Sequence, residues 1–204
     1  MSIEIKISKK RISYKKAMLF LNKRVDEVKN GKKRELLWIL EHPTTYTAGV
    51  RFNQKEILDK KIKVVQSNRG GKITLHNPGQ KIIYFVLNLN NRKRDIRKLI
   101  SIIEKSIISF LSTYGIKGKK DKKNIGIWVD DKKIAAIGLR VSKWIAYHGC
   151  SINISNDLSQ YRKIIPCGLD GCKVGKLSSW IPGLKVSDVN PLMKKQLVER
   201  FGLY

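Results

Sequence analysis

The sequence has little cysteine and little proline: three cysteines and five prolines among 204 residues. A sparse and odd set of cysteines argues against a disulfide framework and favours a reducing compartment, so we expect a cytoplasmic protein. The chain is long enough to bury a core without disulfides or a structural metal. Because it also lacks repeats, linkers and sharp shifts in composition, we expect residues 1–204 to fold as a single domain. We also expect a monomer, although none of these patterns determines the oligomeric state.

Long hydrophobic runs are also missing, since no stretch approaches the roughly 18 apolar residues that a membrane-spanning helix needs. The first residues, "MSIEIKISKKRISY", contain neither the apolar segment nor the cleavage site of a secretory signal peptide. An amphipathic pattern begins at Ser13, which leaves little room for a transit peptide, although composition alone leaves that possibility open. We expect no membrane association.

Acidic residues are scarce, with 16 Asp and Glu against 43 Lys and Arg, for a formal net charge of +27. Such a field attracts nucleic acid, an anionic membrane or an acidic protein. The lysines are dispersed along the chain, and no aromatic-interleaved nucleic-acid motif accompanies them. We therefore expect no nucleic-acid partner, while a general Lys and Ile bias explains the charge about as well as steering of an acidic partner does.

The hydrophobic periodicity favours an α+β fold with a mixed, largely antiparallel sheet wrapped by helices. Apolar residues at helical spacing predict a helix capped by Ser13 and ended by Gly31, a helix from about Asp95 to Tyr114, and a last helix over Val189–Phe201. β-branched and apolar runs predict strands at 35–40, 61–66, 81–89 and 143–154, and a hairpin whose arms are 125–129 and 133–141. The predicted elements lack the rhythm of a doubly wound sheet.

The cysteines and histidines do not form a metal-binding pattern. Cys167 and Cys172 have the spacing of half a zinc site, but a second pair is missing. Cys150 and the three histidines are spread singly along the chain. We expect no metal ion.

A nucleophilic cysteine is the other interpretation of "PCG" at Pro166 to Gly168, because Pro166 stiffens the approach and Gly168 has no Cβ to obstruct an acyl group. By itself this motif is weak, since most isolated intracellular cysteines are buried fillers. Paired glycines in "RGGKITLHNPGQ" at 69–80 would let backbone N–H groups approach a ligand. In "DDKKIAAIGLR" a lysine precedes small residues, but spacing does not distinguish Lys132 from Lys133.

Five ordered motifs together resemble the octanoyltransferases of lipoate biosynthesis, also called lipoyl(octanoyl) transferases or the lipoate-protein ligase B family. The motifs are "EHPTTYTAG" at 41–49, "RGGKITLHNPGQ" at 69–80, "KIAAIGLRV" at 133–141, "YHGCSINI" at 147–154 and "IIPCGL" at 164–169. The resemblance implies the fold shared by lipoate and biotin protein ligases. It also implies transfer of an octanoyl group from octanoyl-acyl carrier protein, through a cysteine thioester, to a lysine of a lipoyl domain or of the glycine cleavage H protein.

The resemblance also implies the site residues. It maps the nucleophile to Cys167 and the partner lysine to Lys133 rather than Lys132. It maps the acyl-substrate contacts to Arg69, Gly70, Gly71, Lys72, Ile73, Thr74, Leu75, His76, Ala136, Ile137, Gly138, Gly149, Cys150 and Ser151. No cofactor is expected, because the acyl group arrives on the phosphopantetheine of the carrier protein.

Two departures from the family pattern stand near the expected site. Asn77 replaces the usual glycine before Pro78, and Gly175 and Lys176 replace a Thr-Ser pair. The nearest rival function is an ATP-dependent lipoate-protein ligase, which activates a free acid and needs no cysteine. A basic nucleic-acid-binding module is the alternative from another class, and it rests on charge alone.

Overall fold

The computed structural model describes residues 3–121, 124–169 and 171–202, and it contains one large and one small sheet. Lys122 and Lys123 of the basic loop and Asp170 of "IIPCGLDGC" lie outside this description. The large sheet runs, from edge to edge, β1 (Glu4–Ile7), β2 (Leu36–Leu40), β6 (Gln80–Asn88), β10 (Ile145–Asn153), β9 (Lys132–Ser142), β8 (Gly126–Val129) and β7 (Lys119–Lys120). Only the β1–β2 pairing is parallel in this described sheet, so the predicted mixed, largely antiparallel sheet is confirmed.

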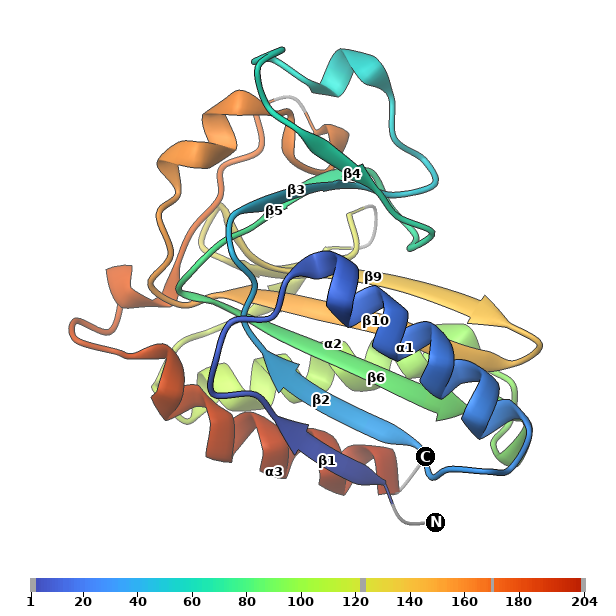
Figure 1. The fold of residues 1–204 in the computed structure, drawn as a ribbon. Helices are drawn as coiled ribbons and strands as arrows, with labels where there is room; N and C mark the ends of the chain where they lie inside the picture. Colours follow the sequence, from blue (N-terminus) through green and yellow to red (C-terminus); the bar gives the residue numbers. More distant parts are fainter. Residues whose placement is uncertain (1–2, 122–123, 170, 203–204) are drawn as a thin grey trace.

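Helices cover both faces of the large sheet (Figure 1). On one face, α2 (Ile96–Ser112) and α3 (Val189–Gly202) pack on an apolar cluster that includes Phe85, Phe110 and Phe201. On the other face, α1 (Tyr14–Lys29) buries Leu21 and its neighbours against β2 and β6. We call the large sheet with these three helices the scaffold. Its continuous apolar strands follow from burial on both sides.

A smaller unit lies over one side of the scaffold sheet (Figure 1). It contains a sheet in the order β4 (Val64–Gln66), β3 (Thr45–Ala48) and β5 (Ile73–His76). The short 3₁₀ turns η1 (Gln54–Glu56), η3 (Ser159–Lys163) and η4 (Pro166–Gly168) join it, and an antiparallel bridge connects Ile57 with Ile164. We call residues 45–76 and 158–169 the cap.

The helix ends agree with the sequence signals. Ser13 Oγ accepts a hydrogen bond from the backbone N–H of Lys16, and Asp95 Oδ1 accepts one from Lys98. Both side chains are helix N-caps, and they accept hydrogen bonds from first-turn N–H groups that have no partner within the helix. Gly31 and Gly115 follow the two helices and adopt the left-handed backbone conformation that commonly ends a helix. Glycine adopts this conformation without the steric penalty that a Cβ would bring. The three predicted helices are confirmed.

Four strands, β1, β3, β5 and β7, escape the sequence pattern, and one strand is shorter than predicted. β1 and β3 are four-residue strands with weak apolar alternation. The strand expected at 61–66 begins only at Val64, because Lys61 and Ile62 both donate to Asp59 in a tight turn. The remaining 3₁₀ turns are η2 (Leu89–Asn91), η5 (Leu177–Ser179) and η6 (Val186–Asp188). Within the described residues, no helix has both the length and the apolar character to cross a membrane.

Candidate active site

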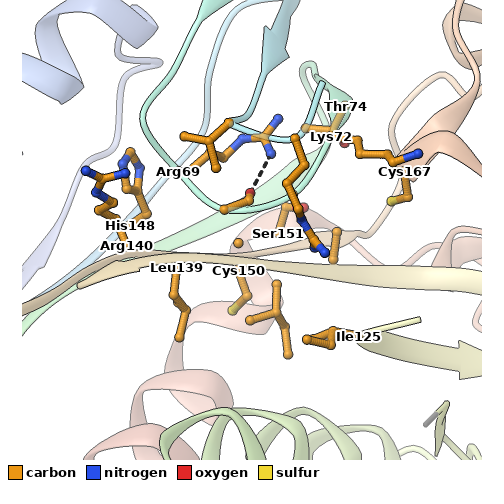
Figure 2. A pocket seen from close by; sticks show the side chains of 18 of the residues that line it. Arg69, Lys72, Thr74, Ile125, Leu139, Arg140, His148, Cys150, Ser151 and Cys167 are labelled. Atoms are coloured by element: carbon orange, nitrogen blue, oxygen red, sulfur yellow. Dashed lines mark hydrogen bonds between the residues drawn. The ribbon is translucent and has the colours of Figure 1, made fainter. Parts of the chain in front are cut away.

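A cavity of about 610 Å³ lies between the cap and strands β9 and β10 (Figure 2). The structure brings nearly all of the expected site residues to its walls. Those lining it are Arg69, Gly70, Gly71, Lys72, Ile73, Thr74, His76, Lys133, Ala136, Ile137, Gly138, Gly149, Cys150, Ser151 and Cys167. Leu75 does not line it; its side chain is buried in the apolar cluster of the cap, with Tyr46, Tyr161 and Ile164.

Cys167 sits in the middle of η4 in a left-handed backbone conformation, with φ 59° and ψ 10°. For a residue with a Cβ this conformation is strained, and such strain persists only where the surroundings enforce it. Gly168 follows with φ 62°, and the N–H groups of Gly168 and Leu169 donate to Ile165 and Pro166. The tight turn presents the thiol toward β9 rather than into the cap core (Figure 2).

Lys133 meets that thiol from the scaffold side. Its Nζ lies 3.3 Å from Cys167 Sγ, although the side chain is 94% buried and starts on β9. Within the described residues no carboxylate is placed to pair with Lys133, and its ammonium lies 5.7 Å from the Trp128 ring centroid. Lys132 is exposed and lies over Trp180 instead. Of the two adjacent lysines, the structure places Lys133 at the thiol.

The paired glycines let the cap approach the sheet closely. The N–H of Gly70 donates to the carbonyl of Leu139 on β9 at 2.9 Å. A Cβ on Gly138 would lie 3.1 Å from the carbonyl oxygen of Gly70, and one on Gly70 would lie 2.8 Å from that of Leu139. Larger residues here would push the 69–71 loop off the sheet and open the cavity.

Arg69 is a buried cation in the cavity wall. Its guanidinium donates to the backbone carbonyl and hydroxyl of Thr47 at 2.7 and 2.9 Å, and to the carbonyl of Gly70 at 3.0 Å. Burial lowers the pKa of Arg69 from its ordinary value. The arginine thus fixes the 69–71 loop to β3.

Buried aromatic and imidazole rings form another wall of the cavity. Burial, with a smaller contribution from the Arg69 cation, lowers the pKa of both His76 and His148 to about 3. His76 Nδ1–H donates to Gln80 Oε1 at 2.8 Å, and His148 Nε2–H donates to Asn68 Oδ1 at 2.6 Å. Both imidazoles are neutral at neutral pH, so they contribute shape and hydrogen bonds to the cavity rather than charge.

The other two thiols have different surroundings. Cys150 lines the cavity but is buried, and burial raises the pKa of its thiol to about 12. Cys172 is half-buried beyond the turn, where burial and the neighbouring Cys167 raise the pKa of its thiol. Since the thiolate is the nucleophilic form, neither environment favours a nucleophile.

The two departures from the family pattern have defined roles in the structure. Asn77 is buried, donates to the carbonyl of Asp157 at 2.8 Å and accepts from Asn156 at 3.0 Å. The N–H of Gly175 donates to the carbonyl of Lys133, and its carbonyl accepts from Asn153. The segment after the cysteine therefore holds the backbone of Lys133.

Several cavity or neighbouring residues carry no sequence signal of their own. Tyr161 is buried, donates to the carbonyl of Leu75 and accepts from Gln80 beneath the cysteine turn. Glu56 is buried beside the 69–73 loop. His148 lies within a motif that implies other residues as substrate contacts, and Tyr84 lies outside all five motifs. Only contacts between distant segments reveal these positions.

The cavity is electropositive. Five of its lining residues are basic, and no Asp or Glu is among the described lining residues. The cations are Arg51, Arg69, Lys72, Lys133 and Arg140. Across the described ranges, no group of three or more His, Cys, Asp or Glu side chains is arranged to hold a metal ion. Such a site suits an apolar chain whose other end is polar or anionic.

The sequence matches a family model and curated relatives over almost its full length. The model of the lipoyl protein ligase A/B catalytic domain matches residues 13–198. A protein named octanoyltransferase from Bartonella bacilliformis is 39% identical over 98% of this chain and 89% of its own. One of the same name from Wolbachia pipientis wMel is 38% identical over 96% of this chain and 98% of its own.

Solved structures share the fold at low identity. A putative lipoate protein ligase from T. acidophilum with bound lipoic acid superposes with a TM-score of 0.77 at 14% identity, covering 99% of this chain and 87% of that one. Lipoate-protein ligase A bound with ATP gives 0.76 at 13% identity, covering 98% and 86%. The expected lipoate-ligase fold is confirmed.

Proposed function

The chain belongs to the lipoyl protein ligase A/B catalytic family, among its octanoyltransferases, and we propose that it transfers an octanoyl group by way of Cys167. The donor is octanoyl-acyl carrier protein, and the acceptor is a lysine of a lipoyl domain or of the glycine cleavage H protein. The observation that carries this proposal is the contact between Lys133 Nζ and Cys167 Sγ at the wall of the cavity.

In the first step, the Cys167 thiolate attacks the carbonyl carbon of the octanoyl thioester, and the bond from that carbon to the donor sulfur breaks. The ammonium of Lys133 gives a proton to the departing pantetheine thiolate. The products are octanoyl-Cys167, a free pantetheine thiol and a neutral Lys133. Exchange of one thioester for another is nearly thermoneutral, so the acyl group stays reactive.

In the second step, the amine of the acceptor lysine attacks the octanoyl-Cys167 carbonyl. Neutral Lys133 takes the proton that the amine loses, and the Cys167 thiolate leaves. This returns the ammonium–thiolate pair and forms an amide, which drives the sequence forward. The N–H groups of Gly70 and Gly168 already donate to the backbone carbonyls of Leu139 and Ile165, so neither is free to donate to an oxyanion.

The cavity is evidence for an eight-carbon acyl chain as the substrate group. The basic surface is evidence for acidic protein partners. About six methylenes at about 0.8 kcal/mol each give roughly 5 kcal/mol of recognition when buried. The five cations around the cavity and the overall charge of +27 favour encounter with acidic carrier and lipoyl domains. The reaction requires no metal ion or bound cofactor beyond the donor's pantetheine arm.

The test is to incubate the protein with octanoyl-acyl carrier protein and measure its intact mass. We expect one octanoyl group on the wild-type chain and on Cys172→Ser, and none on Cys167→Ala. Addition of an apo lipoyl domain should discharge the adduct and octanoylate the domain. Folded protein that takes up no octanoyl group, or Cys167→Ala that octanoylates the domain from free octanoate and ATP, would contradict the proposal.

A further inference from the structure

Glu56 is a buried carboxylate that neither the motifs nor the reaction steps use. It ends η1 in the cap, and its side chain is 5% exposed. A buried charge is costly unless it is paired and hydrogen-bonded. The contacts of Glu56 therefore show what the carboxylate holds in place.

The two carboxylate oxygens reach the 69–73 loop. Oε2 accepts a hydrogen bond from the backbone N–H of Ile73 at 3.2 Å, and Oε1 forms an ion pair with Lys72 Nζ at 3.1 Å. Lys72 and Ile73 both line the cavity. One carboxylate thus fixes both the backbone and a side chain of the loop that covers the cavity.

The same residue also reaches the turn that carries the nucleophile. The carbonyl of Glu56 accepts the N–H of Ile165 at 2.8 Å, two residues before Cys167. A Cβ on Gly168 would lie 2.7 Å from Glu56 Oε1 and would overlap Lys72 Nζ. The Glu56–Lys72 pair therefore packs directly against the residue that follows Cys167 (Figure 2 shows Lys72 beside Cys167).

These contacts explain how Cys167 keeps its strained conformation. The left-handed φ of 59° needs enforcement from outside the turn. The backbone of residues 56–59 forms hydrogen bonds with the segment that leads into the cysteine turn. The Glu56–Lys72 pair packs against Gly168, on the other end of that turn. We propose that Glu56 is a positioning residue whose carboxylate, through its ion pair with Lys72, holds Cys167 in reach of Lys133. This inference rests on the proposed nucleophilic role of Cys167.

Alkylation of Cys167 by iodoacetamide tests the inference without any octanoyl donor. Cys172→Ser is the background, so that the accessible second thiol does not contribute, and intact mass gives the rate at neutral pH. We expect Lys133→Met to slow alkylation about tenfold, because it removes the ammonium beside the thiolate. With Lys133 present, Glu56→Gln should slow it about threefold or more, while with Met at 133 it should have almost no further effect.

This non-additivity distinguishes positioning from general support of the fold. A merely structural Glu56 would change the alkylation rate by the same factor with either residue at position 133. Glu56→Gln keeps an acceptor for Ile73 and has nearly the same volume, so folding is expected. Lys72→Met, whose side chain is 38% exposed, breaks the same tie from its exposed end and should reproduce the effect if Glu56→Gln does not fold.

A matched control is available in the neighbouring ion pair. Lys163 Nζ lies 3.7 Å from Asp59 in a pair with both side chains partly exposed. Lys163→Met should leave the alkylation rate unchanged, since exposed pairs contribute little. The inference is overturned if Glu56→Gln slows alkylation by the same factor with Lys and with Met at position 133. It is also overturned if neither Glu56→Gln nor Lys72→Met slows alkylation. Because no acyl group is transferred, this result is independent of whether the proposed octanoyl transfer occurs.

Discussion

The scaffold and the cap are stabilised by different kinds of contact. The scaffold buries a large cluster of aliphatic and aromatic side chains around Phe85, Phe110 and Phe201. The cap has a small apolar cluster and relies on directional contacts, such as Tyr46 to Gln160, Arg69 to Thr47 and Glu56 to Lys72. Apolar burial has no preferred direction, whereas hydrogen bonds and ion pairs fix geometry.

The candidate site needs both regions, because each supplies one of its two reactive groups. Lys133 comes from β9 of the scaffold, and Cys167 comes from a turn of the cap. Their contact joins residues 34 positions apart. We therefore expect substitutions in the scaffold core to lower the free energy of unfolding, and substitutions in the cap and at its contact with the scaffold to lower the rate with little loss of stability.

Lys133→Met should have the largest effect. Loss of a group that moves a proton in both steps typically lowers a rate by about 10² to 10⁴, and the buried Met should leave the unfolding free energy little changed. Single-turnover octanoylation of a lipoyl domain measures the rate. Lys132→Met, at the exposed neighbour, is the matched control and should retain wild-type turnover. A Lys133→Met rate within about tenfold of wild type would remove the lysine from the mechanism.

Phe110→Ala tests the scaffold side of the comparison. The side chain is fully buried between α2 and the sheet, and its removal should cost about 3–5 kcal/mol of unfolding free energy. Urea unfolding at neutral pH measures this loss, and turnover per folded molecule should stay at the wild-type value. Leu19→Ala, on an exposed position of α1, should change stability little. A similar loss for both variants would show that burial does not decide scaffold stability.

The histidines at the interface give a smaller, pH-dependent effect. Their folded pKa values of about 3 lie below the ordinary 6.5, so below pH 6.5 the unfolded chain binds protons that the folded chain does not. Stability should therefore fall as the pH falls from 6.5 toward 3, by about 1.4 kcal/mol per pH unit for each histidine. Urea unfolding at about pH 7, 6 and 5 measures the slope.

The variant His148→Asn should reduce that slope by the contribution of one proton. Asn is the suitable replacement because His148 has φ 66°, and Asn tolerates the left-handed region better than most residues. An unchanged slope in His148→Asn, or a wild-type stability that does not vary between pH 7 and 5, would contradict the assignment of neutral buried imidazoles.

Ionic strength should produce the smallest effect. If the charge of +27 steers acidic partners, the rate with octanoyl-acyl carrier protein should fall several-fold between about 0.01 and 0.15 M salt, as screening shortens the Debye length. A neutral small-molecule octanoyl thioester, which has no such field, should react at the same rate in both. If the rates with both donors were equally insensitive to salt, a general compositional bias would be the better explanation of the positive charge.

Much of the scaffold is predictable from local pattern. The stripe of apolar residues before Gly115 and the helix N-cap residue Asp95 define α2 almost to the residue. The cap is less predictable, because β3 is a four-residue strand whose pairing with β5 depends on residues 73–76 rather than on its own pattern. Leu75 illustrates the same limit, since a continuous motif includes it while its side chain packs in the apolar cluster of the cap and does not line the cavity.

The sequence by itself determined the chemistry available to this protein: the thiols, the lysine pair before the small residues of β9, the paired glycines and the excess of positive charge. Only the tertiary structure decided which of these groups meet. It buries Cys150, leaves Cys172 beyond the turn, and holds Cys167 in a left-handed backbone conformation with its thiol 3.3 Å from Lys133 Nζ. The physical reason is that burial, strain and ion pairing arise from contacts between segments far apart in the chain, which local spacing does not encode.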